Sequence, residues 1–327
     1  MSDTMRAARI HGWGEAPVVE HVPAPVAGEG EALVRVEVAA VSHLDVTVAG
    51  GDFGIKPNLP YVGGVEGCGV VVTSERFAPG TRVILRGGGI GLMRDGTWAE
   101  LVVTKDKTLT ELPEGLDPEV GATFFQPTTT AHTALHGVGR LGGWLADVPV
   151  ADEHVAVAGA AGAVGSMVTQ LALLSGAKVT ALVADESQVE RVAAGATVVV
   201  SGDDGAIAAL ASDRPATLLV DTLGGADLPA RSRWVRPGGR AVSIGYVAGD
   251  DVRLGLSNWL LDDVALLPVN MIRREREARA LLPELAAMLV SGDLTLDHET
   301  FGMDDLGQAL ELLGTGRVRG RAVVRPS

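Results

Sequence analysis

Three glycines separated by two residues each, Gly159, Gly162 and Gly165, form the stretch with the clearest chemical consequence. The alternating Val and Ala of residues 155–158 precede them with the pattern of a buried strand, and an apolar run at helical spacing follows. Small residues at such a turn let a diphosphate approach bare backbone N–H groups at the positive end of a helix. The sequence therefore predicts a dinucleotide site or, alternatively, only tight strand-to-helix packing. The predicted backbone contacts are Gly159, Ala160, Ala161, Gly162, Ala163, Val164 and Gly165.

The segments after this turn alternate between strand and helix patterns. Strands are predicted at residues 178–183, 197–200, 217–221 and 240–245, with a helix from Asp185 and a turn at residues 236–239. This alternation indicates a doubly wound parallel sheet, which binds its ligand at the carboxyl ends of the strands. We expect this α/β domain to span residues 126–261.

The flanking segments read differently. Residues 1–125 contain short strand-like runs separated by Pro and Gly, which favours a compact, barrel-like β domain. Residues 262–327 contain helices at 276–290 and 304–313, the latter with Asp304 as N-cap, and a last strand expected to return to the first domain. The predicted architecture is an α/β domain inserted in a split β-rich domain, with a small-molecule cleft between them.

The composition disfavours several classes of partner and of structural feature. The 327 residues carry a formal net charge of −14, which disfavours nucleic acid and anionic membrane as partners. Cys68 is the single cysteine, so neither an intrachain disulfide nor a cysteine zinc cage can form. The first residues lack a signal-peptide layout, and no apolar run reaches the ~20 residues that span a bilayer. We expect a cytoplasmic protein.

Seven sequence blocks, in order along the chain, resemble a known family. They are residues 64–72, 79–83, 95–103, 159–165, 221–225, 236–240 and 316–324. Together they are similar to the medium-chain dehydrogenase/reductase superfamily, in its zinc-independent, quinone-oxidoreductase-like branch. The resemblance implies a Rossmann domain inserted in a GroES-like domain, and NAD(P)H-dependent reduction of a quinone, enone or other activated carbonyl or alkene.

The positions that bind catalytic zinc in relatives of this family hold other residues here. Ser42, Val65 and Pro127 stand at the three ligand positions, and the four-cysteine lobe is absent. His132 and His136 have i, i+4 spacing but lack the adjacent Glu and the third ligand of a zinc helix. We therefore predict no metal.

The resemblance also implies contacts for the nicotinamide half of the coenzyme. It places the nicotinamide against Thr130 and the backbone of Ser243, Ile244 and Gly245, and the adenosine side over Thr222, Leu223 and Gly224. Thr130 could instead cap a helix that begins there. Tyr246 could line the cleft or serve as a packing aromatic.

Reduction without a metal requires a hydrogen-bond donor for the oxygen that gains charge. Relatives often carry Asn where Ser42 stands and Tyr where Thr47 and Phe53 stand, so the usual donors are absent. Ser42 and His43 are the candidate catalytic donors, with Asp45 nearby to orient them. A structural role for His43 is the alternative.

Coenzyme choice depends on the residues after the second strand of the sheet. NAD-specific domains place an acid there, whereas this chain has Val183, which favours NADPH. Asp185 with Gln188 fits a helix cap, although an Asp so close would repel a 2′-phosphate, and Arg191 could bind that phosphate.

Three functions follow as alternatives. The first is an NADPH-dependent reductase, the second an alcohol dehydrogenase, and the third a nucleotide-binding homologue that has lost catalysis and serves a structural or regulatory role. We also expect a homodimer that pairs an edge strand at residues 251–256.

Overall fold

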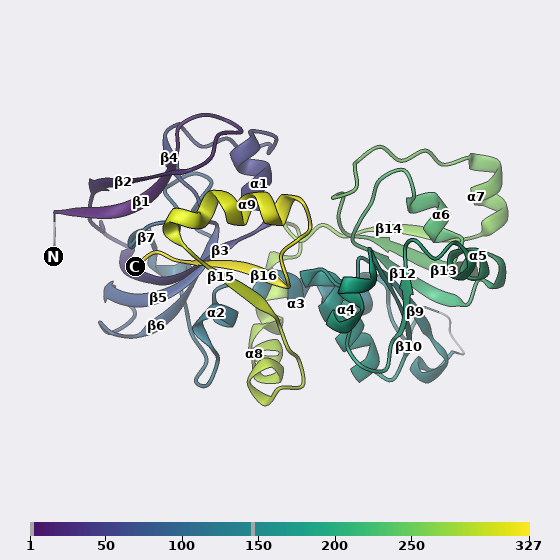
Figure 1. Cartoon of the computed structure of the whole chain (residues 1–327). Helices are drawn as coiled ribbons and strands as arrows, with labels where there is room; N and C mark the ends of the chain where they lie inside the picture. Colours follow the sequence, from purple (N-terminus) through teal and green to yellow (C-terminus); the bar gives the residue numbers. More distant parts are fainter. Residues whose placement is uncertain (1–2, 145–147) are drawn as a thin grey trace. The chain divides into compact units, whose positions relative to one another are not determined.

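A computed structural model describes residues 3–144 and 148–327. It divides into two compact units (Figure 1). The β-rich unit comprises Met1–Phe125 and Leu296–Ser327, and the parallel-sheet unit comprises Gln126–Thr295. The second unit therefore extends beyond the predicted boundary at residue 261, because β14 (Ala265–Pro268) adds a strand to its sheet.

The parallel-sheet unit has six strands in the order β11-β10-β9-β12-β13-β14, all in parallel pairs. This is the strand order of a Rossmann domain, so the predicted fold class is confirmed. The other strands are β9 (His154–Ala158), β10 (Lys178–Val183), β11 (Thr197–Val200), β12 (Ala216–Asp221) and β13 (Val235–Ser243). The helices are α3 (Phe125–His132), which continues as a π-helix (Thr133–Val138), α4 (Ala163–Leu174), α5 (Asp204–Asp213), α6 (Leu228–Ser232), α7 (Leu256–Asp262) and α8 (Glu275–Ser291).

The β-rich unit is organised around β3 (Glu31–Val41), the long strand that pairs with β5, β7 and β16. The indole of Trp98, fully buried, donates a hydrogen bond to the Ala40 carbonyl of this strand. A seven-stranded sheet contains β15 (His298–Gly302), β16 (Arg321–Arg325), β3, β5 (Glu66–Thr73), β6 (Arg82–Arg86), β8 (Thr110–Glu111) and β7 (Leu101–Lys105). A second sheet contains β2 (Val18–Pro23), β1 (Thr4–Ile10) and β4 (Tyr61–Val62). The helices are α1 (His43–Gly50), α2 (Pro118–Gly121) and α9 (Leu306–Gly314).

The last strand returns to the first domain as predicted, since β16 is antiparallel to β3. Asp304 does not cap α9. It lies in a short 3₁₀ helix, Met303–Asp305, where its carboxylate binds the Arg6 guanidinium. The expected helix after Asp185 is only a 3₁₀ helix, Glu186–Arg191.

Two further predictions in the parallel-sheet unit are wrong. Residues 236–239, expected to be a turn, belong to β13, which accommodates them through a register shift opposite β12. Residues 251–256 contain no strand: they are exposed, and α7 starts at Leu256. The edge strand on that side is β14.

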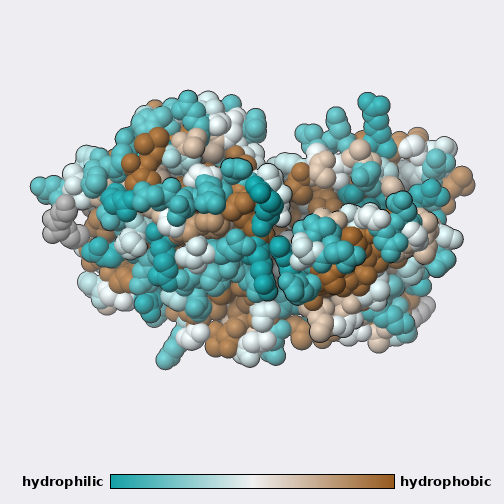
Figure 2. All heavy atoms as spheres, in the orientation of Figure 1, coloured by the Kyte–Doolittle hydropathy of each residue, from teal (hydrophilic) through white to brown (hydrophobic). Residues whose placement is uncertain are grey.

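The visible surface is mostly polar (Figure 2), although 46% of the residues are hydrophobic. Figure 2 shows hydrophilic side chains over most of the visible face, with hydrophobic ones in separate patches. In the described part of the chain, no helix has the length and apolar character needed to cross a bilayer.

Candidate functional site

The glycine turn lies between β9 and α4, at the carboxyl edge of the parallel sheet. Gly162 is the N-cap of α4 and offers no side chain to bond the amides of the first turn, Ala163–Gly165. A Cβ on Gly165 would overlap the Gly159 carbonyl, whereas one on Gly162 would lie 3.3 Å from that oxygen. Gly165 is thus required for packing, while Gly162 keeps the approach to the free amides open.

The loops after β12 and β13 meet beside this turn. The Thr222 hydroxyl donates a hydrogen bond to the Ala158 carbonyl at the end of β9 (2.8 Å). A Cβ on Gly224, whose φ is 66°, would lie 2.6 Å from the Gly245 carbonyl oxygen. The structure therefore brings together the predicted contacts of residues 159–165, 222–224 and 243–245, largely through backbone.

Neither Thr130 nor Tyr246 has the surroundings expected for its alternative role, a helix cap for Thr130 and a packing aromatic for Tyr246. Thr130 is buried inside α3, which begins at Phe125, so it does not cap the helix. Its Oγ1 is a buried atom with no hydrogen-bond partner among the described residues, which leaves it available to a ligand. Tyr246 is 63% exposed, so it is not a packing aromatic of the parallel-sheet unit.

The residues after β10 form a capped turn. The Asp185 carboxylate accepts hydrogen bonds from the Ser187 amide (2.9 Å) and hydroxyl (2.5 Å), as the cap prediction requires. These bonds, with the nearby Arg191 charge, lower the pKa of Asp185, so it is ionised at neutral pH. The Gln188 side chain accepts from the Ala184 amide (3.1 Å). Val183 is buried and offers no polar group.

In the β-rich unit, Ser42 and Asp45 form a closed network at the start of α1. The Ser42 hydroxyl donates to Asp45 Oδ2 (2.6 Å), and the Val65 amide donates to Asp45 Oδ1 (3.1 Å). Burial raises the pKa of Asp45 to about 6, against the opposing effect of the Ser42 hydrogen bonds. Asp45 therefore connects the segments that contain Ser42 and Val65. The Ser42 hydroxyl proton is already used in a hydrogen bond to Asp45.

His43 is separate from that network. It is exposed, and no hydrogen bond to its ring is found within the described part of the chain, so Asp45 orients Ser42 but not His43. Partial desolvation of the ring, with the Arg321 charge, lowers the pKa of His43. A neutral ring at pH 7 can still donate one hydrogen bond.

Sequence reasoning missed a buried charge cluster next to Asp45. Glu66 Oε1 accepts from Arg86 (2.9 Å), while Glu66 Oε2 lies 3.6 Å from Arg321 Nη2. Neither Glu66 Oε2 nor Arg321 Nη2 has a hydrogen-bond partner among the described residues. Arg321 also donates from Nε to Thr123. The available signal was an arginine that opens the apolar strand at residues 321–324.

The described residues contain no group of three or more His, Cys, Asp or Glu side chains suited to a metal. The His132 and His136 rings do contact one another, with centroids 4.7 Å apart and planes tilted by 49°. Burial lowers the pKa of both imidazoles.

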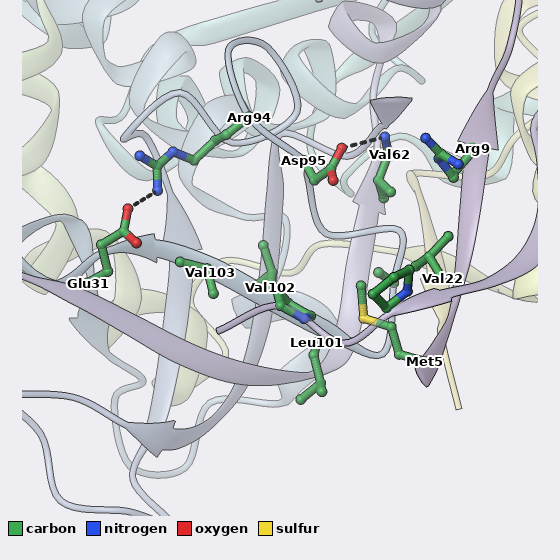
Figure 3. A pocket seen from close by; sticks show the side chains of 13 residues that line it. Met5, Arg9, Val22, Glu31, Val62, Arg94, Asp95, Leu101, Val102 and Val103 are labelled. Carbon is green, nitrogen blue, oxygen red and sulfur yellow. Dashed lines mark hydrogen bonds and ion pairs between the residues drawn. The ribbon is translucent and has the colours of Figure 1, made fainter. Parts of the chain in front are cut away.

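A cavity of about 430 Å³ lies in the β-rich unit (Figure 3). Arg94 binds Glu31 on one side of it (2.8 Å), and Asp95 accepts from the Val62 amide (2.9 Å). Its lining includes none of the predicted site residues. We assign the cavity no part in the site.

Two known protein families match two separate segments of the chain. Residues 28–114 match the alcohol dehydrogenase GroES-like domain family, and residues 163–287 match the zinc-binding dehydrogenase family. An alcohol dehydrogenase of Geobacillus stearothermophilus is 25% identical, with 98% of this chain and 99% of the relative covered. The acrylyl-CoA reductase AcuI of Ruegeria pomeroyi is 28% identical over 90% of each chain.

Among solved structures, a quinone oxidoreductase of Pseudomonas syringae pv. tomato DC3000 superposes with a TM-score of 0.82 at 23% identity, covering 98% of this chain and 100% of that one. Both domain families occur in their expected order, and the quinone-oxidoreductase fold is shared along the chain. The chain belongs to the medium-chain dehydrogenase/reductase superfamily of oxidoreductases, in its quinone-oxidoreductase-like branch.

Proposed function

We propose that this protein is an NADPH-dependent reductase of a quinone, enone or other activated carbonyl or alkene. The observation that carries the proposal is the carboxyl edge of the parallel sheet, where α4 begins with free amides. The buried, unpartnered Thr130 hydroxyl in the same unit supports a ligand at that edge. A bound nicotinamide coenzyme would supply the hydride.

The residues present fit such a coenzyme. The Ala163, Val164 and Gly165 amides would hold the diphosphate, and Thr222–Gly224 would lie against the adenosine side. Thr130 and the backbone of residues 243–245 would orient the nicotinamide. Binding by backbone amides is pre-organised, because these groups are fixed by the sheet and the helix.

NADPH is the proposed coenzyme because no acidic side chain ends β10. Val183 is buried there, and Asp185 already uses its carboxylate to bond Ser187. Arg191, at the end of the 3₁₀ helix, is the candidate partner of a 2′-phosphate.

We propose that the reaction uses no zinc. The Ser42 hydroxyl is bonded to Asp45, and neither Val65 nor Pro127 carries a side-chain ligand atom. His43 is the proposed hydrogen-bond donor to the substrate oxygen, since its ring is free of internal bonds to the described residues. Activity should survive exhaustive treatment with a chelator.

The direct test is NADPH oxidation at 340 nm with a panel of quinones, enones and enoyl thioesters. Turnover of at least one class, with NADPH preferred over NADH, is the expected result. Coenzyme binding without turnover of any class would favour the non-catalytic homologue. Turnover of simple alcohols with NAD⁺ or NADP⁺ would favour the alcohol dehydrogenase.

We also propose a homodimer, now through β14. Among the described strands it pairs with β13 alone, and it is half-buried along Ala265, Leu266 and Leu267. The nearby α7 exposes Leu256, Leu260 and Leu261. A second copy would cover this edge. A monomeric mass by light scattering at micromolar concentration would exclude it.

A further inference from the structure

A buried ion pair lies directly behind the loop that follows β12. Asp221 is the last residue of β12 and is fully buried, and Arg231, in α6, is nearly so. Arg231 Nε donates to Asp221 Oδ2 (2.6 Å), and its Nη2 donates to the Gly224 carbonyl (2.6 Å). The guanidinium thus spans both ends of residues 221–224.

The other carboxylate oxygen of Asp221 fixes the same loop from within. Asp221 Oδ1 accepts from the Leu223 amide (2.9 Å) and from the Gly224 amide (2.7 Å). The buried pair of Asp221 and Arg231 therefore binds two amides and one carbonyl of this loop. A fork-like guanidinium suits this task because it donates in two directions at once.

This loop in turn sets the position of the loop after β13. The Ile244 amide donates to the Asp221 carbonyl (2.9 Å), and the Ala248 amide donates to the Leu223 carbonyl (2.9 Å). Gly224 also packs backbone against backbone on Gly245. A displacement of residues 222–224 would consequently displace residues 244–248.

A second buried pair in the same unit provides a contrast. Arg240 binds Glu153 (2.6 Å), and both side chains are fully buried. This pair bonds Thr217, near the start of β12, and the Gly139 carbonyl and Gly142 amide. It contacts none of the predicted coenzyme residues, so it supports the fold at the opposite end of β12.

We propose that Arg231 is a positioning residue for the coenzyme: through Asp221 and the Gly224 carbonyl it holds the two loops that receive the adenosine and nicotinamide halves. The inference rests on the proposed function, because it presumes that these loops bind a dinucleotide. Arg231 itself is buried behind the loop and acts only through it.

The test compares Arg231→Lys with Glu153→Gln in the full-length protein. Lysine keeps the charge but cannot donate to Asp221 and Gly224 as a fork. Three quantities are measured: the melting temperature, the dissociation constant for NADPH and for NADH by calorimetry, and hydrogen exchange of the Leu223 and Gly224 amides. Asp221→Asn serves as the second variant if Arg231→Lys does not fold, and Thr217→Val is the milder control.

We expect Arg231→Lys to weaken coenzyme binding by about tenfold or more and to speed exchange of both amides by a similar factor, since hydrogen bonds to charged groups are lost. Glu153→Gln should lower the melting temperature while leaving the dissociation constant within about twofold of the wild-type value. Unchanged binding by Arg231→Lys, or equal loss of binding in both variants, would overturn the positioning role.

The two proposals fail differently. If the wild-type protein binds neither coenzyme, the proposed function is wrong, and the positioning role falls with it. If the wild type binds and Arg231→Lys binds equally well, only the positioning role is wrong.

Discussion

The candidate residues of the two units satisfy their polar groups by different means. In the parallel-sheet unit they act largely through backbone: α4 begins with amides that no described side chain caps, and the loops touch through glycines. In the β-rich unit they act through side chains: Asp45, Glu66 and Arg321 are buried together, and Glu66 Oε2 and Arg321 Nη2 have no hydrogen-bond partner among the described residues. The candidate residues of the parallel-sheet unit are fixed by steric fit and those of the β-rich unit by charge, so substitutions in the two units should have different effects.

A substitution in the glycine turn should show the largest effect on coenzyme binding. Gly165→Ala places a Cβ against the Gly159 carbonyl, and overpacking of this kind costs about 1–3 kcal/mol of unfolding free energy. We expect coenzyme binding to be lost because the turn must open. Calorimetry and thermal denaturation measure both effects.

Gly162→Ala is the matched control for that substitution. Its Cβ would lie 3.3 Å from the same carbonyl, so the fold should survive while the diphosphate is hindered. A variant Gly165→Ala that binds coenzyme normally would contradict the steric account of this half.

Breaking the charge cluster should mainly cost stability. Arg321→Met leaves Glu66 without its second cation, and removing one partner of a buried pair typically costs about 3–5 kcal/mol. Thermal denaturation should show the loss. The exposed pair Arg319 and Asp297 offers a control, since Asp297→Asn should change stability by less than about 1 kcal/mol. Equal effects would contradict the view that burial makes this cluster costly to break.

Asp45 should give the β-rich unit a pH-dependent stability. Its pKa is about 6 in the folded state against 3.8 ordinarily, so the folded protein binds the proton more tightly. This contribution is fully present below about pH 4 and is lost as the pH rises through about 6, with a limit of about 3 kcal/mol. Denaturation of the wild type and of Asp45→Asn at several pH values should show this slope in the difference between their stabilities. A wild type that gains stability over the variant from pH 4 to 6 would contradict the sign.

His43 should show the smallest effect, and on rate alone. Replacing it by Phe removes the donor, which we expect to lower kcat by roughly ten- to hundredfold with coenzyme affinity unchanged. His43→Gln keeps a donor and should retain more of the rate. If both variants match the wild type in steady-state kinetics, His43 has only a structural role.

The same contrast explains how much could be predicted from the sequence. The order of strands, the glycine turn and the returning strand β16 follow from residue type and spacing, which are local properties. The alternating residues 251–256 predict an edge strand, but their side chains are exposed to solvent on both sides. The strand instead forms at β14, whose short apolar run carries no alternation.

The charge cluster could not be predicted because its members are distant in sequence. Glu66 and Arg321 are brought together by β5, β3 and β16, and only the register of those strands shows that they meet. The bonding of Ser42 to Asp45 is local and follows a capping pattern. The sequence alone suggests that Asp45 orients a catalytic donor, whereas in the structure the Ser42 hydroxyl already donates its hydrogen bond to Asp45.

Calorimetric titration of the purified protein with NADPH tests the central claim most directly. We expect the wild type to bind one NADPH per chain and to prefer it over NADH. Gly162→Ala should bind NADPH more weakly by about tenfold or more, at an unchanged melting temperature. Absence of binding heat with either coenzyme, confirmed by equilibrium dialysis, would contradict it.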